Sequence, residues 1–318
     1  MALLGRMIVA IMPLAPKPIV RMVASRYVAG SKIEDAVMTM KKLSSEGACF
    51  TVDVLGEEIT SMSEAEFFLN EYSRLIDSIS QNNIDAHISI KPTAFGLLIN
   101  QELAFENIQK ITKKASENDI FVRLDMEDSR VTDPTIELMT RIRSEGLKNI
   151  GVVLQGRLFR TISDIEKICE ELGHESDFRI CKGIYLEPKE IAYTGYGEIV
   201  DATNNAIESM LRKGAYTAIA SHDYPVIDNS LSLLKKYGLS PDAENYSFPG
   251  KGPGYEFQFL LGVRGDLRRR LSSEGHLTRI YVPYGQQWYE YGIRRLKENP
   301  EVATHVLKAL LMPWTNRR

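Results

Sequence analysis

The strongest constraint on the fold of this chain is a regular alternation of short β-rich runs with amphipathic helical runs. Eight such pairs follow one another from residue 49 onward, with no long linker between them. The helical runs carry apolar residues at helical spacing, which is typical of helices that cover a sheet. Eight successive β/α units predict a closed parallel (β/α)8 barrel of the TIM type.

The alternation assigns the elements in order. We expect strands over residues 49–55, 84–90, 120–126, 149–155, 178–181, 217–221, 255–261 and 278–282. We expect helices over residues 31–46, 63–81, 102–118, 133–145, 163–172, 198–213, 225–237 and 266–274, and a last helix that runs through Asn299. Residues 1–47 are therefore predicted to form an N-terminal helical arm, and residues 48–318 the barrel. A doubly wound open sheet is the alternative, but it normally has a glycine-rich loop after its first strand, and residues 54–57 contain no GxGxxG.

Charge and cysteine content exclude several classes of function. The net charge of −3 argues against nucleic acid as a partner, because phosphate binding needs a basic excess. Cys49, Cys169 and Cys181 form no CxxC pair and match no zinc spacing, so we expect reduced thiols. The apolar run 7–16 is shorter than the ~20 residues that span a bilayer. We expect this arm to pack on the body of the protein, with contact with a membrane surface as the alternative.

Polar residues gather at the predicted carboxyl ends of the strands, where a barrel carries its active site. They are Lys91, Asp125, Glu127, Asp128, Gln155, Lys182 and His222. The carboxylates are suited to magnesium or manganese, and together with His222 to a transition metal. A lysine at a strand end is suited to a Schiff base. Mutual pairing in a polar barrel mouth is the third interpretation.

The segment after the last predicted strand is the most specific part of the sequence. Residues 279–285 read RIYVPYG, and residues 288–299 read WYEYGIRRLKEN. Arg294 and Glu298 lie four residues apart and so share a helix face. Arg294 and Arg295 diverge by ~100° unless both bend toward one ligand. Two guanidinium groups are well suited to a carboxylate, although adjacent surface arginines are commonly just solvated charge.

This C-terminal stretch resembles the signature of proline dehydrogenases. Five other blocks match that family in the same order: residues 124–128 (LDMED), 153–155 (VLQ), 179–185 (RICKGIY), 220–222 (ASH) and 255–262 (YEFQFLLG). The similarity runs from about Cys49 to the end of the sequence. It implies a distorted (β/α)8 barrel that binds FAD without a Rossmann fingerprint. It also implies oxidation of L-proline to pyrroline-5-carboxylate by hydride transfer to the flavin N5.

The resemblance further implies roles for individual residues and no metal site. The residues matched to proline binding are Lys91, Arg294 and Arg295 at the carboxylate, Glu298 as support for the arginine pair, and Asp125, Tyr185 and Tyr281 around the ring. The residues matched to FAD binding are Arg179 near N5, Thr194 at a phosphate, and Gln155, Lys182, His222 and Leu260 elsewhere. Relatives that prefer hydroxyproline tend to have a smaller residue in place of Tyr281, so the resemblance implies a preference for L-proline.

Partners and location also follow from the resemblance. Electrons are expected to pass to a membrane quinone. No aldehyde dehydrogenase domain follows the barrel, so a separate pyrroline-5-carboxylate dehydrogenase is expected to process the product. We expect a cytoplasmic protein, with peripheral contact with the inner membrane as an addition. The rival hypotheses are a metal- or Schiff-base-dependent lyase on the same barrel, and a non-catalytic barrel that binds a ligand or a partner.

Two features set conditions on this interpretation. Residues 247–254 (SFPGKGPG) look like extra material before the seventh strand, either a surface insertion or a lid or flavin-edge loop. Strict alternation puts Arg179 and Lys182 on opposite faces of the fifth strand. Both can reach one flavin only if the strand ends near Cys181 and Gly183 lets the chain turn.

Overall fold

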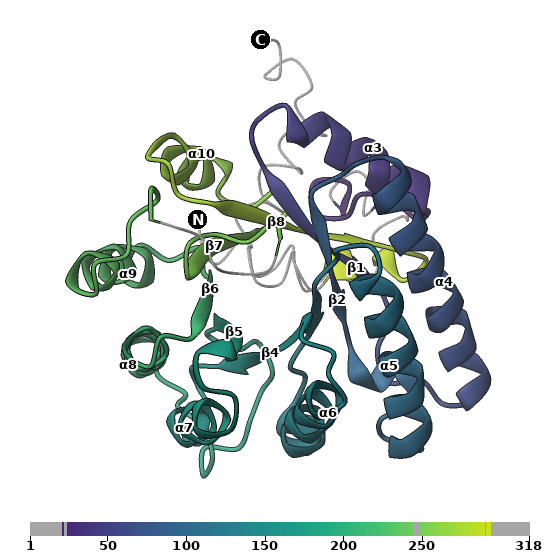
Figure 1. The fold of residues 1–318 in the computed structure, drawn as a ribbon, viewed down its shortest axis with the longest axis horizontal. Helices are drawn as coiled ribbons and strands as arrows, with labels where there is room; N and C mark the ends of the chain where they lie inside the picture. Colours follow the sequence, from purple (N-terminus) through teal and green to yellow (C-terminus); the bar gives the residue numbers. More distant parts are fainter. Residues whose placement is uncertain (1–20, 22–23, 244–248, 290, 294–318) are drawn as a thin grey trace.

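Eight parallel strands close into a barrel, in sequence order from β1 to β8, and helices surround them (Figure 1). The computed structural model describes residues 21, 24–243, 249–289 and 291–293. Strand β1 pairs with both β2 and β8, which closes the sheet. The (β/α)8 barrel that the sequence predicts is confirmed.

The expected strands, and the expected helices up to α10, are present, with ends shifted by a few residues. The strands are β1 (Cys49–Val54), β2 (Ala86–Ile90), β3 (Val122–Leu124), β4 (Ile150–Gln155), β5 (Asp177–Cys181), β6 (Tyr216–Ala220), β7 (Tyr255–Leu260) and β8 (Thr278–Tyr284). The helices are α3 (Ile33–Ser44), α4 (Met62–Gln81), α5 (Gln101–Ser116), α6 (Thr132–Ser144), α7 (Thr161–Leu172), α8 (Tyr196–Arg212), α9 (Tyr224–Lys236) and α10 (Gly265–Ser273). Short 3-10 helices are η2 (Pro92–Phe95), η3 (Ser129–Val131) and η4 (Gly173–Glu175). Most of the last predicted helix lies outside the described residues.

Helix α4 shows how local sequence positions the strand ends. Ser61 and Glu64 form a capping box, in which the Glu64 carboxylate accepts from the Ser61 backbone N–H at 3.0 Å. The buried face of the helix carries Tyr72, whose hydroxyl donates to the Ser89 carbonyl at 2.5 Å and accepts from the Val54 N–H at 3.1 Å. One helix therefore ties the ends of β1 and β2 together, just below the polar mouth of the barrel.

Helix α3 takes an unusual place. It precedes β1 in sequence and packs against β8, β1 and α4, with Ile33, Ala36 and Met40 buried in the common core. In a regular barrel the helix after the last strand completes the outer ring. Here the chain after β8 brings Tyr291 to the carboxyl end of the barrel instead. The proposed boundary between an arm and a barrel at residue 47 stays a prediction.

The barrel interior is polar. In β1, Phe50, Val52 and Val54 face the helices and belong to the hydrophobic core. Asp53 lies between them in sequence and is fully buried, with its carboxylate on the Lys91 ammonium. Barrels of this class usually fill their interior with layers of branched apolar side chains. Charged pairs take that place in this protein.

A charged network occupies the amino end of the barrel. Arg279 of β8 is 0% exposed and donates from Nε to Glu256 Oε1 of β7 at 2.9 Å. Arg123 of β3 pairs with Asp177 of β5, and the Lys251 ammonium pairs with the same carboxylate. Buried charges require such partners, because an ion left alone in the protein interior is strongly unfavourable.

The loop before β7 contributes Lys251 and covers this amino end. The Lys251 Nζ lies 3.3 Å from the centre of the Phe121 ring, and the Pro249 carbonyl lies 3.3 Å from His87 Nε2. Arg279 also donates to the Gly250 carbonyl. The sequence allowed two interpretations of residues 247–254: a surface insertion, or a lid or flavin-edge loop. For residues 249–254 the lid or flavin-edge interpretation is wrong, because buried Lys251 anchors the loop at the end opposite the polar mouth. The surface-insertion interpretation stays a prediction.

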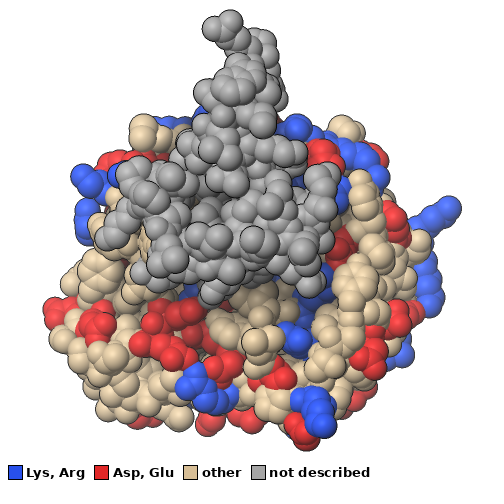
Figure 2. All heavy atoms as spheres, turned by 180° about the vertical axis from the view of Figure 1, so that it is seen from behind, with Lys and Arg blue, Asp and Glu red and all other residues tan. Residues whose placement is uncertain are grey.

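The outer surface mixes charges of both signs. Acidic and basic side chains are interspersed over the face drawn in Figure 2. Among the described residues, no helix combines the length and the apolar character needed to cross a bilayer.

We expect Asp177→Asn to lower the free energy of unfolding by about 3–5 kcal/mol, because Arg123 and Lys251 lose their buried carboxylate. Urea unfolding measures the change, with Asp201→Asn on the exposed face of α8 as the matched control. A loss similar to that of the control would show that the amino-end network does not depend on Asp177.

Candidate active site

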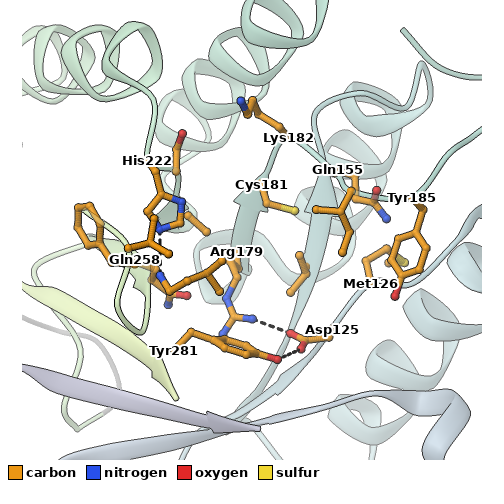
Figure 3. Close-up of a pocket in the computed structure, with 18 of the residues that line it drawn as sticks. Asp125, Met126, Gln155, Arg179, Cys181, Lys182, Tyr185, His222, Gln258 and Tyr281 are labelled. Carbon is orange, nitrogen blue, oxygen red and sulfur yellow. Dashed lines mark hydrogen bonds and ion pairs between the residues drawn. The ribbon is translucent and has the colours of Figure 1, made fainter. Parts of the chain in front are cut away.

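A cavity of about 460 Å³ opens at the carboxyl end of the barrel (Figure 3). Nine of the residues predicted from the sequence line it: Lys91, Asp125, Gln155, Arg179, Lys182, Tyr185, His222, Leu260 and Tyr281. They come from the ends of seven strands or from the turns that follow them. The closed barrel brings together side chains that are far apart in sequence, because every parallel strand ends on the same rim.

A buried ion pair forms one side of the cavity. The Lys91 Nζ lies 2.7 and 2.8 Å from the two oxygens of Asp53, and 3.9 Å from Asp125 Oδ2. Lys91 is 8% exposed, so little solvent screens this pair. Burial by itself would lower the pKa of Lys91, but the carboxylates of Asp53 and Asp125 outweigh burial and raise it above its ordinary value. Lys91 is therefore an ammonium ion at neutral pH.

Asp125 is the centre of the hydrogen-bond network at the mouth. Its Oδ1 accepts from Arg179 Nη1 at 2.6 Å and from the Ser89 hydroxyl at 2.9 Å. Its Oδ2 accepts from the Tyr281 hydroxyl at 2.7 Å, and Figure 3 shows Arg179 and Tyr281 converging on this carboxylate. Burial and then the charge of Asp125 raise the pKa of Tyr281 well above its ordinary value, so its hydroxyl stays a donor.

Two buried polar atoms at the cavity find no hydrogen-bond partner among the described residues. They are Gln155 Oε1 and Arg179 Nε. Gln155 is anchored at its other end, where Nε2 donates to the Glu127 carbonyl at 2.6 Å. A buried polar atom without a partner is costly. An acceptor and a donor of this kind indicate a polar ligand that supplies the missing bonds.

The end of β5 meets the condition that the sequence set for Arg179 and Lys182. The strand ends at Cys181, and Gly183 has φ of +96°, a conformation that favours glycine. A Cβ at Gly183 would lie 2.5 Å from Gln155 Oε1. The turn brings Lys182 to the outer rim of the same cavity, where it points away from Arg179 and Asp125 (Figure 3). Its ammonium pairs there with Asp223.

His222 and Leu260 interact directly. The His222 Nε2 accepts from the Leu260 backbone N–H at 3.0 Å, so a neutral ring carries its proton on Nδ1. The His222 ring packs edge-on against Phe259, with ring centroids 5.7 Å apart. Both contacts fix the ring at the cavity wall.

Four predicted site residues are not placed in the cavity. Thr194 is exposed and is not among the residues that line it. Arg294, Arg295 and Glu298 lie outside the described residues. Tyr185, which does line the cavity, donates from its hydroxyl to Glu57 Oε2 at 3.3 Å. The functional roles of all these residues stay predictions.

The geometry does not support the metal and Schiff-base interpretations. Asp125, Glu127 and Asp128 point to different partners: Arg179 and Tyr281, Thr93, and Arg130. Among the described residues, no three His, Cys, Asp or Glu side chains are grouped as metal ligands are. Lys91 is held as an ammonium, which is not the nucleophilic form.

Sequence reasoning missed several residues of this site. Asp53, Ser89 and Gln258 all carry polar side chains into the polar network, and Glu127 was considered only as a metal ligand. Asp53 had a detectable signal, because it is a charged residue inside the otherwise uncharged strand run CFTVDV. Ser89 had none, since one serine in a strand is ordinary.

The fold and the cavity together define a (β/α)8-barrel protein with a polar pocket at the carboxyl ends of its strands, where enzymes of this fold carry their active sites. Residues 36–308 match the family model described as Proline dehydrogenase. The chain therefore belongs to the proline dehydrogenase family, the enzymes that oxidise proline, and the resemblance seen in the sequence is confirmed.

Named relatives agree with the family match. Proline dehydrogenase 1 of Bacillus subtilis (strain 168) is 33% identical over 291 residues, which cover 92% of this chain and 91% of the relative. Proline dehydrogenase of Deinococcus radiodurans is 33% identical over 292 residues, 91% of this chain and 90% of the relative. The crystal structure of proline utilization A from Bdellovibrio bacteriovorus, inactivated by N-propargylglycine, superposes with a TM-score of 0.78 at 22% identity. That match covers 87% of this chain and 32% of the other, and it shows the shared fold.

Asp53→Asn is expected to lower the free energy of unfolding by about 3–5 kcal/mol, because Lys91 loses the carboxylate that neutralises it. Lys91→Met in addition should recover part of the loss, with a coupling energy on the order of 1–3 kcal/mol. Urea unfolding of the two single variants and the double variant gives the cycle. Strictly additive losses would mean that the ion pair does not stabilise the barrel mouth.

Proposed function

We propose that this enzyme uses FAD to oxidise L-proline to pyrroline-5-carboxylate, with hydride transfer from proline to the flavin N5. One observation carries the proposal. In a chain of the proline dehydrogenase family, Lys91, Arg179 and Tyr281 surround Asp125 in one cavity beside two buried polar atoms that lack partners. The cations of Lys91 and Arg179 can bind an anion on one side of the cavity. On another side, the two buried polar atoms can bind a polar ligand.

The residues present fit a flavin. The ring system of a flavin carries N–H donors and carbonyl acceptors, which match the acceptor Gln155 Oε1 and the donor Arg179 Nε. Lys182 at the rim and His222 at the wall add polar contacts for the rest of the cofactor. Leu260 and Thr194 complete the proposed set. Bound there, FAD supplies the hydride acceptor of the reaction.

The protein's own part in the reaction is to hold proline. Lys91 offers its ammonium to the substrate carboxylate, because its raised pKa keeps it charged. We assign the opposite side of that carboxylate to Arg294 and Arg295, supported by Glu298. Charge-assisted forks of this kind fix both the position and the direction of a carboxylate.

The ring of proline needs a wall of defined shape. Tyr281 is held by its hydrogen bond to Asp125, and the Arg179 guanidinium lies 5.4 Å from the centre of its ring. Tyr185 is held by Glu57 on the other side of the pocket. Aromatic walls fixed by hydrogen bonds orient a small substrate and leave little room for water.

The wider context is part of the same proposal. The reduced enzyme passes its electrons to a membrane quinone, and a separate pyrroline-5-carboxylate dehydrogenase processes the product. The enzyme works in the cytoplasm, with peripheral contact with the inner membrane.

Release of the cofactor tests the proposal directly. Mass spectrometry of the purified, heat-released cofactor is expected to find FAD, because the polar set at the cavity matches a flavin. Anaerobic mixing with L-proline should bleach the flavin absorbance. A fully folded preparation that carries only FMN or no flavin, or one that L-proline does not bleach, would refute it.

Substrate choice depends on Tyr281. We expect L-proline to be strongly preferred over trans-4-hydroxy-L-proline, since the ring of Tyr281 fills the space that a hydroxyl would need. Tyr281→Ser should narrow the preference chiefly by weakening proline binding, at a cost on the order of 1–3 kcal/mol. Steady-state kinetics on both substrates measure this. A wild type that uses both equally well would mean that Tyr281 does not select the substrate.

A further inference from the structure

Glu127 is a buried acid whose side chain contacts the turn after β2. The residue is 4% exposed. Its Oε1 accepts from the Thr93 backbone N–H at 3.1 Å, and its Oε2 accepts from the Thr93 hydroxyl. One carboxylate thus takes both donors of a single threonine, which fixes that threonine in position and in rotation.

Thr93 belongs to η2, which begins directly after Lys91. Only Pro92 separates Lys91, which carries the ammonium, from Thr93, which Glu127 holds. The Thr93 hydroxyl oxygen also accepts from the Glu58 backbone N–H at 2.9 Å. Glu57, the neighbour of Glu58, accepts from the Tyr185 hydroxyl. Glu127 therefore connects the segments that follow β1, β2 and β3. Lys91 follows β2, and Asp125 follows β3.

The main chain of Glu127 acts on the cofactor side. Its carbonyl accepts from Gln155 Nε2 at 2.6 Å. A carbonyl can only accept, so the amide nitrogen of Gln155 must face it. The other end of the amide, Oε1, is then the atom left for a ligand.

We propose that Glu127 is a positioning residue of the reaction: its carboxylate sets Lys91 toward proline through Thr93, and its carbonyl sets the Gln155 amide toward the flavin. The proposal rests on the function proposed above. A purely structural residue would affect only folding. Here the Glu127 side chain is expected to affect the KM for L-proline, and its main-chain carbonyl is expected to affect FAD binding.

Protonation of Glu127 changes the contact with Thr93. Burial raises the pKa of Glu127 to about 7, against the lowering effect of the two Thr93 bonds. The charged groups that face it are Lys91 after β2, which lowers the pKa, and Glu57 after β1, which raises it. A protonated carboxyl donates to the Thr93 oxygen and leaves the Thr93 hydroxyl hydrogen without this acceptor. The ionised form, which prevails above neutral pH, accepts from both the N–H and the hydroxyl of Thr93 and so holds the turn in place.

The side-chain effect is tested in the FAD-loaded enzyme. Glu127→Ala is expected to raise the KM for L-proline about tenfold, equivalent to 1.4 kcal/mol, while kcat changes less than about threefold. The KM of the wild type should fall as the pH rises from about 6 to 8. Glu127→Gln keeps an acceptor for the N–H but offers a donor to the hydroxyl oxygen at every pH, as the protonated acid does, so its KM should match the low-pH value of the wild type and lose this pH dependence.

The controls separate positioning from folding. Glu137→Ala removes an exposed acid of α6 and should leave both constants unchanged. FAD binding to the apoprotein, followed by flavin fluorescence, should be the same for wild type and Glu127→Ala, because the Glu127 carbonyl remains. If Glu127→Ala does not fold, Thr93→Val carries the same KM measurement; it removes the hydroxyl contacts with Glu127 and with the Glu58 N–H and keeps the bond from the Thr93 N–H. An unchanged KM in these variants, or a KM for Glu127→Gln with the wild-type pH dependence, overturns the proposal.

Crystal structures of the wild type and of Glu127→Ala test the role of Glu127 independently of the proposed function. In Glu127→Ala the turn η2 should shift and Lys91 should lose at least one of its two bonds to Asp53. A wild type that does not oxidise L-proline refutes the proposed function, and the crystal structures still decide the role of Glu127. Lys91 bonded to both Asp53 oxygens in the variant overturns the positioning role whatever the activity.

Discussion

The Asp125 carboxylate is the interaction on which the active end of the barrel depends. It accepts hydrogen bonds from Ser89 of β2, Arg179 of β5 and Tyr281 of β8, and Lys91 lies close to it. Strands that are not neighbours in the sheet are joined through this one group. Hydrogen bonds to an ionised acceptor are among the strongest in proteins, and burial limits their screening by water. The cavity at the carboxyl end takes its shape from this convergence.

The polar interior of the barrel has two layers with different tasks. At the amino end, Arg123, Asp177, Glu256 and Arg279 pair with one another, and Lys251 covers them from the loop before β7. At the carboxyl end, Gln155 and Arg179 each keep one buried polar atom without a hydrogen-bond partner among the described residues. Paired buried groups stabilise a fold, whereas an unpaired buried polar atom needs an explanation, and beside a cavity a polar ligand supplies one. The amino end is therefore support, and the carboxyl end is the site.

Much of the site was predictable because strand ends are readable in the sequence. Lys91, Asp125, Gln155 and His222 each end or follow a β-rich run, and the (β/α)8 topology alone brings them onto one rim. The pairings of Asp53 and Glu127 were not predictable in the same way. Their partners, Lys91 and Thr93, are separated from them by more than thirty residues. No local pattern reports a contact of that sequence separation.

The position of the loop at residues 249–254 was likewise not predictable from the sequence. Its sequence predicted extra material before the seventh strand, but not that Lys251 would enter the barrel and pair with Asp177. By itself, the sequence determined the order of strands and helices, the family, and which polar residues lie at strand ends, because periodicity and local motifs are short-range properties of the chain. Only the tertiary structure decided which charges are paired, which buried atoms lack a partner, and which side of the barrel the loop covers. Those outcomes depend on distances and burial that arise only when remote segments meet.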